Sequence, residues 1–165
     1  MEKYKFILTT LIFTFIAQNA YAAISVPVHS ITNSSDSDLG IVTIKKSKCG
    51  ILLSPQLHNL PPGIHGFHIH DKAACSDNGL AAGGHLDPDK TNAHLGPYKN
   101  GHLGDLPVLI VSSDGTANLP VLAPRLTMED VKGRSLMIHA GGDNYADKPE
   151  KMGGGGTRIA CGTIE

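Results

Sequence analysis

Short stretches in which apolar and polar side chains alternate dominate this sequence. They lie at residues 24–29, 40–45, 51–54, 66–70, 108–111, 117–120, 135–139 and 157–164. Alternation with a period of two places every second side chain on the same face, so each stretch predicts a short β-strand. Eight such strands with turn signals between them predict an all-β, antiparallel barrel or sandwich. Only Thr127-Met128-Glu129-Asp130 indicates helix, as an N-cap and one turn.

Two long segments, residues 70–107 and 140–156, interrupt the strand pattern. Loops of this length in a compact domain are usually functional or disordered. The first segment is rich in histidine, and the second ends in Gly153-Gly154-Gly155-Gly156 just before the last predicted strand. A flexible linker is the alternative explanation for the glycines, but a strand with a cysteine follows them. We therefore expect two site-building loops within one domain.

The first 22 residues have the composition of a secretory signal peptide. Lys3 and Lys5 precede an apolar run over residues 6–17, and Ala20-Tyr21-Ala22 supplies small residues for a signal peptidase. The run is too short for a comfortable membrane span, and no cysteine near the cleavage point offers a lipid attachment site. We expect cleavage before Ala23, a mature domain over residues 23–165, and a protein exported without a membrane anchor.

Charge and composition exclude one class of partner and draw attention to histidine. Removing Lys3, Lys5 and Glu2 from 14 basic and 15 acidic side chains leaves 12 and 14, a net charge of −2 that does not favour nucleic acid. Nineteen glycines and ten prolines are typical of a chain rich in turns, and nine histidines are unusual for this length. Three cysteines in an exported chain leave room for one disulfide and one spare thiol, without indicating which pair.

A histidine pair on one predicted strand is the first candidate for chemistry. Alternation places Phe67 and Ile69 on one face and both His68 and His70 on the other. Alone, such a pair is more often a solvated strand face than a metal site. His139 ends another predicted strand and could bring a third imidazole alongside.

The long first loop adds a second set of candidate ligands: His85, His94, His102 and Asp105. Three imidazoles and a carboxylate satisfy the closed tetrahedral site that structural zinc prefers. Any one of these histidines could be a solvated loop residue, but the whole set is hard to explain in that way. Imidazole suits copper and zinc alike, whereas the aspartate favours zinc. An all-histidine copper site beside this zinc site requires one histidine to serve both metals.

Six motifs, in order along the chain, carry a resemblance to a known family. They are GFHIH at 66–70, GGHLDP at 83–88, HLGP at 94–97, GHLGDLP at 101–107, HAGGD at 139–143 and GGGTRIACG at 154–162. Together they resemble copper/zinc superoxide dismutase in its bacterial periplasmic form, over essentially the whole mature chain. The family fold, an eight-stranded Greek-key barrel or sandwich, agrees with the strand pattern.

The resemblance implies roles for particular residues. The implied copper ligands are His68, His70, His85 and His139, and the implied zinc ligands are His85, His94, His102 and Asp105. His85 would bridge the two metals, and Asp143 would steady one histidine on each side. Cys75 and Cys161 would form the family disulfide, leaving Cys49 as the free thiol. Arg158 would attract and orient an anionic substrate, with Lys72, Lys99, Lys148 and Lys151 extending the positive field.

The resemblance also implies a reaction, a location and a partner. Copper would take an electron from one superoxide and pass it to a second, releasing oxygen and hydrogen peroxide, while His85 carries a proton. The enzyme would act in the periplasm, with superoxide as substrate. An enzyme of this kind can be a monomer or a homodimer, and we favour the homodimer slightly. A protein that buffers or delivers metal is the alternative from another class, although His85 and Arg158 favour turnover. A zinc hydrolase is the second alternative, but the zinc ligands leave no open position and no glutamate lies beside them. His29, His58 and His65 fall outside the motifs and are given no catalytic part.

Overall fold

A computed structural model describes residues 22–32 and 37–165 of the chain. The predicted signal peptide therefore lies, apart from Ala22, outside the described residues. The described strands are β1 (Ile24–Ser30), β2 (Asp38–Ser47), β3 (Gly50–Leu57), β4 (Gly63–His65), β5 (Phe67–His70), β6 (Leu109–Val111), β7 (Val121–Ala123), β8 (Arg134–His139) and β9 (Arg158–Ile164).

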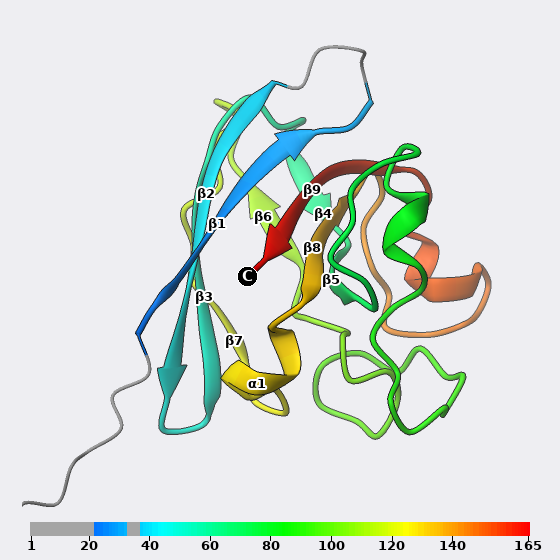
Figure 1. Cartoon of the computed structure of the whole chain (residues 1–165). Helices are drawn as coiled ribbons and strands as arrows, with labels where there is room; N and C mark the ends of the chain where they lie inside the picture. Colours follow the sequence, from blue (N-terminus) through cyan, green and yellow to red (C-terminus); the bar gives the residue numbers. More distant parts are fainter. Residues whose placement is uncertain (1–21, 33–36) are drawn as a thin grey trace, which may run out of the picture.

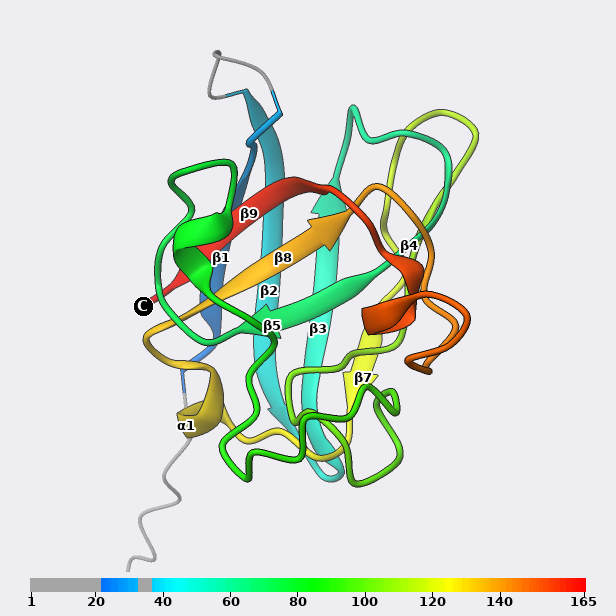
Figure 2. The same cartoon turned by 90° about the vertical axis from the view of Figure 1, so that its right-hand side faces the viewer.

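Seven of these strands form one antiparallel sheet in the order β5-β8-β9-β1-β2-β3-β7, and β4 pairs with β6. The sheet curls so that β1, β2 and β3 face β5, β8 and β9 across the core (Figures 1 and 2). Val42 and Leu53 fill the core from one side, and Phe67 and Ile138 fill it from the other. The predicted all-β class is confirmed.

The structure corrects two of the predicted strands. The predicted strand at residues 66–70 is preceded by a separate short strand, β4, because the chain bends at Gly66, whose N–H donates to Gly141 O (2.8 Å). Residues 117–120 were predicted as a strand, which is wrong: Ala117 forms only an isolated bridge with Leu57, and the strand begins at Val121. Pro120 has no N–H to continue a ladder at that point.

Helix is sparse in the described part of the chain. The predicted single turn is confirmed as α1 (Met128–Val131), capped by Thr127, whose side chain and that of Asp130 each bond the other's backbone N–H. Two short 3₁₀ helices, η1 (Leu80–Ala82) and η2 (Lys151–Gly154), lie in the two long loops. Among the residues described, no helix has the length and hydrophobicity needed to cross a membrane.

The first long loop docks along the open edge of β5, the last strand of the large sheet. The N–H of Leu86 donates to Ile69 O (2.9 Å), and the N–H of Ile69 donates to Gly104 O (2.9 Å). His85 bridges His70, and Asp105 bridges His68, in an antiparallel sense. These backbone contacts bring loop residues against the strand that carries the histidine pair.

A disulfide fastens the same loop to β9. Cys75 and Cys161 are joined across a sequence separation of 86 residues, which confirms the pairing that the resemblance implies. Cys49 is free, as expected, and it is exposed in the turn between β2 and β3. The loop is thus attached to the barrel at two places, the β5 edge and β9.

Candidate metal centre

Three buried histidines on paired strands form one side of the centre. His68 and His70 lie on β5, His139 ends β8, and all three are at most 6% exposed. The two strands are neighbours, with His68 opposite Met137. One ring nitrogen from each of these histidines and from His85 lies within 4.8 Å of the others. The strand register and the bridge between His70 and the loop residue His85 therefore bring together the four residues expected to hold copper.

The other side of the centre converges on one carboxylate oxygen. The Nδ1 atoms of His85, His94 and His102 lie 2.9, 3.1 and 3.5 Å from Asp105 Oδ1. Ligand bonds of about 2.0 to 2.1 Å give a tetrahedral site with edges of about 3.3 Å. The three observed separations bracket that edge length, so the distances from Asp105 Oδ1 to the three imidazoles suit a tetrahedral zinc site.

His68 also lies close to this second group. Its ring stacks on that of His85 with centroids 3.9 Å apart, and one of its nitrogens lies within 4.8 Å of donor atoms of His85, His94 and Asp105. His68 Nε2 bonds Asp143 Oδ2 (2.7 Å). His102 lies outside this group of four donors, but its Nδ1 is 3.5 Å from Asp105 Oδ1.

Asp143 links the two sides through its fully buried carboxylate. Oδ2 lies 2.7 Å from His68 Nε2, and Oδ1 lies 2.8 Å from His94 Nε2. The N–H of Tyr145 donates to Oδ1 as well (2.7 Å). A histidine that donates one N–H to a carboxylate keeps its ring orientation and leaves the other nitrogen for a metal. Asp143 thus orients one histidine of each set.

The glycine run in the second loop is explained by this contact. A Cβ at Gly153 would lie 2.0 Å from Asp143 Oδ1 and 2.7 Å from His94 Nε2, and φ is +73° there. Any side chain would displace the carboxylate, and the positive φ favours glycine as well. The flexible-linker explanation is therefore unnecessary, because the loop packs directly on the site.

Burial keeps the strand histidines neutral. It is the main cause that lowers the pKa of His68 to about 3, of His70 to about 2 and of His139 to about 4, with neighbouring His85 adding to the effect. Burial also lowers the pKa of His85. Neutral imidazole is the form that binds a metal, so these side chains are ready to do so at neutral pH.

The carboxylates have the opposite effect on the loop side. Burial alone would lower the pKa of His94, but hydrogen bonds to Asp105 and Asp143 outweigh it and raise that pKa to about 9. Burial would raise the pKa of both aspartates, yet the surrounding histidines hold each well below its usual range. The loop side is therefore a compact anionic pocket that attracts a cation.

Unpartnered ring nitrogens provide the test of whether metals fit. Each strand histidine uses one nitrogen for a protein oxygen: His68 Nε2 for Asp143, His70 Nδ1 for Gly83 O (3.0 Å), and His139 Nδ1 for Gly156 O (3.1 Å). The remaining nitrogens are buried without a hydrogen-bond partner, and Nδ1 of His94 and of His102 is also buried and has no well-aligned hydrogen bond, although each lies near Asp105 Oδ1. Buried polar atoms are normally satisfied. Three of these five nitrogens belong to strand histidines grouped with His85, and the other two lie within 3.5 Å of Asp105 Oδ1, an arrangement that fits two metal ions.

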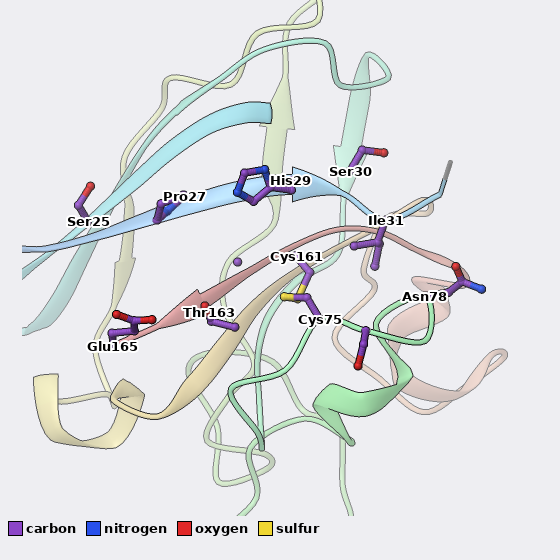
Figure 3. Close-up of a pocket in the computed structure, with 12 residues that line it drawn as sticks. Ser25, Pro27, His29, Ser30, Ile31, Cys75, Asn78, Cys161, Thr163 and Glu165 are labelled. Carbon is purple, nitrogen blue, oxygen red and sulfur yellow. A yellow bond between two sulfur atoms is a disulfide. The ribbon is translucent and has the colours of Figure 1, made fainter. Parts of the chain in front are cut away.

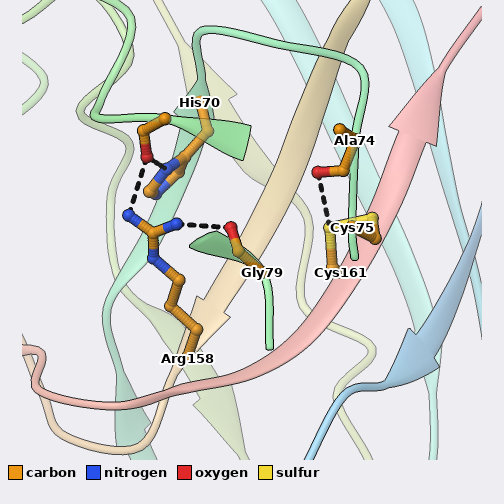
Figure 4. The surroundings of a disulfide bond; sticks show 7 residues. His70, Ala74, Cys75, Gly79, Arg158 and Cys161 are labelled. Carbon is orange, nitrogen blue, oxygen red and sulfur yellow. Dashed lines mark hydrogen bonds between the residues drawn. A yellow bond between two sulfur atoms is a disulfide. The ribbon is translucent and has the colours of Figure 1, made fainter. Parts of the chain in front are cut away.

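Arg158, at the start of β9, extends towards the strand histidine His70 (Figure 4). Its guanidinium donates to Gly79 O and to Gly83 O (2.7 Å), two carbonyls of the loop that the disulfide anchors. Gly83 O also accepts from His70 Nδ1, so a single carbonyl connects Arg158 with a strand histidine. Burial lowers the pKa of the guanidinium from its ordinary, very high value. The side chain is half-buried, fixed and cationic beside the histidines.

The lysines and the remaining histidines differ in their placement. Lys72, Lys99, Lys148 and Lys151 are all exposed on the two loops, where their contribution to a guiding field stays a prediction. His65 was given no part, yet it is buried, with Nδ1 2.7 Å from His139 O and Nε2 2.8 Å from Pro61 O. Its ring therefore supports the backbone of a candidate ligand.

A surface groove elsewhere does not involve these residues. It runs along the outer faces of β1 and β9 beside the disulfide, and Pro27, His29 and Thr163 line it (Figure 3). None of the clustered histidines lies in its wall. The chemistry of the described residues is concentrated at the buried cluster.

Fold and site together define an all-β protein with two adjacent groups of buried candidate metal ligands. A family model described as copper/zinc superoxide dismutase (SODC) matches residues 39–164. The chain belongs to the copper/zinc superoxide dismutase family. It is an oxidoreductase that dismutes superoxide, and its cofactors are copper and zinc.

Relatives agree in sequence and in structure. A copper/zinc superoxide dismutase of Francisella tularensis is 53% identical over 145 residues, covering 83% of this chain and 78% of the relative. The copper/zinc superoxide dismutase from Brucella abortus superposes with a TM-score of 0.81 at 43% identity, covering 87% of this chain and all of that one. The monomeric enzyme from Salmonella enterica gives a TM-score of 0.76 at 47% identity, with 87% of this chain and all of that one covered.

Proposed function

We propose that this superoxide dismutase holds copper with His68, His70, His85 and His139, and zinc with His85, His94, His102 and Asp105. The observation that carries the assignment is the set of five buried ring nitrogens that make no well-aligned hydrogen bond. His85 belongs to both groups of donor atoms, and its Nδ1 faces Asp105. The other nitrogen, Nε2, is then available to the copper side.

Each protein group has a part that follows from its position. Bound copper supplies one-electron redox chemistry between its two oxidation states, and bound zinc supplies a fixed positive charge. His85 holds and releases a proton at Nε2 while Nδ1 stays on the loop side. Asp143 keeps the rings of His68 and His94 oriented through both turnover steps. The histidine cluster is at most 7% exposed, which limits the access of water.

Arg158 guides the substrate in this proposal. Superoxide is a small anion, and a guanidinium fixed by two carbonyls presents charge and N–H groups in a constant direction. A surface salt bridge is the competing explanation. Within the described part of the chain, no carboxylate lies within 4 Å of this guanidinium.

Metal stoichiometry of variants tests the ligand assignment. The reconstituted native chain should carry one copper and one zinc, His139→Ala should lose copper and retain zinc, and His102→Ala should do the reverse. His58→Ala, which alters an exposed histidine, is the matched control and should carry both metals. Elemental analysis after dialysis gives the answer. Zinc retained in full by His102→Ala, or a single metal in a fully active native chain, would overturn the assignment.

We also propose that residues 1–22 are a cleaved signal and that the enzyme acts in the periplasm. The disulfide supports this location, because such bonds persist in oxidising compartments. Mass spectrometry of protein recovered from a periplasmic fraction should show a chain beginning at Ala23. A full-length chain confined to the cytoplasmic fraction would contradict the proposal.

A homodimer stays a prediction for this chain. Ile64 and Ile110 are paired across β4 and β6 and are 57% and 47% exposed, so a two-fold contact over this face would bury apolar surface. Sedimentation should give a dimer for the native chain and a monomer for Ile64→Lys. A native monomer at all concentrations would overturn it.

A further inference from the structure

Arg125 contacts a run of backbone carbonyls in the first long loop. It lies between β7 and α1, outside every motif that the family resemblance rests on. Its Nε donates to Pro97 O (3.0 Å) and its Nη1 to Gly101 O (3.2 Å). Its Nη2 donates to Gly96 O (3.4 Å) and to His102 O. One guanidinium therefore engages four carbonyls within seven residues.

These carbonyls depend on Arg125 for hydrogen bonds. Residues 96, 97, 101 and 102 are all buried, and no strand or helix is formed between them. Among the described residues, Arg125 is the recorded donor to Gly96 O, Pro97 O and Gly101 O, and only His102 O has a second donor, the N–H of Asp105 at 3.4 Å. A buried carbonyl without a donor is costly, so the loop path is stable only with the guanidinium in place.

The segment that Arg125 holds is the one that separates two proposed zinc ligands. His94 lies two residues before the first of these carbonyls, and His102 carries the last. The segment is closed at its base by His102 N–H to Ala93 O (2.9 Å) and by Gly96 N–H to Asp105 Oδ2 (3.1 Å). A shift in the backbone at either end would therefore move His94, His102 or Asp105 relative to one another.

We propose that Arg125 is a positioning residue for zinc, which sets the spacing of His94, His102 and Asp105 through the backbone between them. This inference rests on the proposed zinc ligand set. The hydrogen bonds of Arg125 go to backbone carbonyls and not to the side chains of the proposed zinc ligands, so it acts on them through the backbone. A planar guanidinium has five N–H donors in fixed directions, whereas the ammonium group of lysine has only three and cannot donate to all four carbonyls. The shape of the group, and not its charge alone, is what the loop requires.

A purely structural role for Arg125 predicts a different result. If Arg125 only fastens the loop to the β7–α1 connection, its loss should lower stability and weaken both metals to a similar degree. If it sets ligand spacing, zinc should be weakened selectively, because three of the four proposed copper ligands lie on β5 and β8, where the pairing of the two strands fixes their positions.

The test compares Arg125→Lys and Arg125→Gln with the matched control Arg134→Lys. Arg134 also donates to a backbone carbonyl, that of Asp71, and to the Asp71 carboxylate, but it lies away from residues 96–102. Zinc and copper affinities are measured separately by chelator competition, and unfolding of the metal-free chain is followed by circular dichroism. Cobalt(II) placed in the zinc site reports ligand geometry through its visible absorption bands.

Arg125→Lys should lower zinc affinity about 10- to 100-fold, the usual cost of losing a group that orients metal ligands. Copper affinity should fall by far less, the cobalt bands should shift, and the control should stay within about twofold of native for both metals. Zinc affinity within about twofold of native in both Arg125 variants, or equal losses for zinc and copper, would overturn the inference. A native chain that binds no zinc in the same series would instead refute the proposed ligand set.

Discussion

His68, His70 and His139 lie on two neighbouring strands of the sheet, whereas His85, His94, His102 and Asp105 lie on the loop that follows β5. On the strands, hydrogen-bonded register fixes where each histidine points, and the same ladder that builds the core builds half of the centre. On the loop, no ladder exists beyond the contacts with β5. Position there depends on separate attachments, chiefly the disulfide, Asp143 and Arg125.

Because of this difference, the two halves of the centre should lose metal separately. Changes in the loop attachments should weaken zinc binding first and copper binding second.

Removal of the disulfide should have the largest effect. In the chain-entropy model a closure of 86 residues contributes about 4 to 5 kcal/mol to the free energy of unfolding. The double variant Cys75→Ser/Cys161→Ser should lose most of this in denaturant titration of the metal-free protein, and zinc affinity should fall more than copper affinity. Cys49→Ser is the control, with an expected change below about 0.5 kcal/mol because the residue is exposed. A greater loss of copper affinity than of zinc affinity would contradict the view that the loop half depends more on the disulfide than the strand half does.

Asp143→Asn should come next, at about 10- to 100-fold in zinc affinity. An amide has one acceptor oxygen, so it can serve His68 or His94 but not both. The strand register holds His68 in place, and we therefore expect the loop residue His94 to move. Competitive metal titration of zinc and copper separately measures the split. If copper binding suffers more, the strand does not provide the rigidity attributed to it.

Substitution of Arg158 by Lys, a neutral residue or Glu should change catalysis and leave metal binding unaltered. Catalytic efficiency should follow the order Arg, Lys, neutral, Glu, with Arg158→Glu about tenfold or more below native at low salt. Arg158→Lys should retain much of the rate because attraction survives while the planar fork is lost. Added salt should slow the native enzyme, since the screening length is about 8 Å at physiological ionic strength. The metal content of all variants must be equal for the comparison. If Arg158→Glu with both metals bound runs at the native rate at low salt, Arg158 does not guide the substrate.

The smallest effect should be the pH dependence of stability in chelated, metal-free protein. Lowered pKa values of His68 (about 3), His70 (about 2) and His139 (about 4) mean that their contribution is present above pH 6.5 and is lost as pH falls below it. The raised pKa of His94, about 9, works in the opposite sense, with stability lost as pH rises from 6.5 towards 9. Thermal unfolding should show both limbs, and His94→Gln should abolish only the alkaline one. An unchanged alkaline limb in that variant would contradict the assignment.

The same contrast explains how much could be predicted from the sequence. Alternation alone placed His68 and His70 on one face, because a strand has a fixed period. Spacing within an irregular loop carries no such geometry. Donor chemistry suggested His85, His94, His102 and Asp105 as a zinc-type set, and the family resemblance assigned their individual roles. The bend at Gly66 and the late start of β7 at Val121 depend on tertiary contacts.

Residues that act on the backbone gave no signal at all. Arg125 and His65 bond to main-chain carbonyls, and every residue in the chain has a carbonyl. The need for glycine at position 153 was equally invisible, since Asp143 and His94 approach it only in the folded chain. Family motifs identify candidate metal ligands, but they do not identify residues such as Arg125 that position those ligands through backbone hydrogen bonds.

The docking of the first loop on β5 has a consequence for association between molecules. A terminal strand offers unpaired N–H and carbonyl groups to any other strand that approaches it. At the far end of the large sheet, β7 is only three residues long, whereas β5 at the near end is covered by Leu86 and Gly104. The loop that carries the zinc ligands is thus also a cover for the sheet edge. Loosening that loop would expose a template for strand pairing, so metal retention and resistance to aggregation are properties of the same segment.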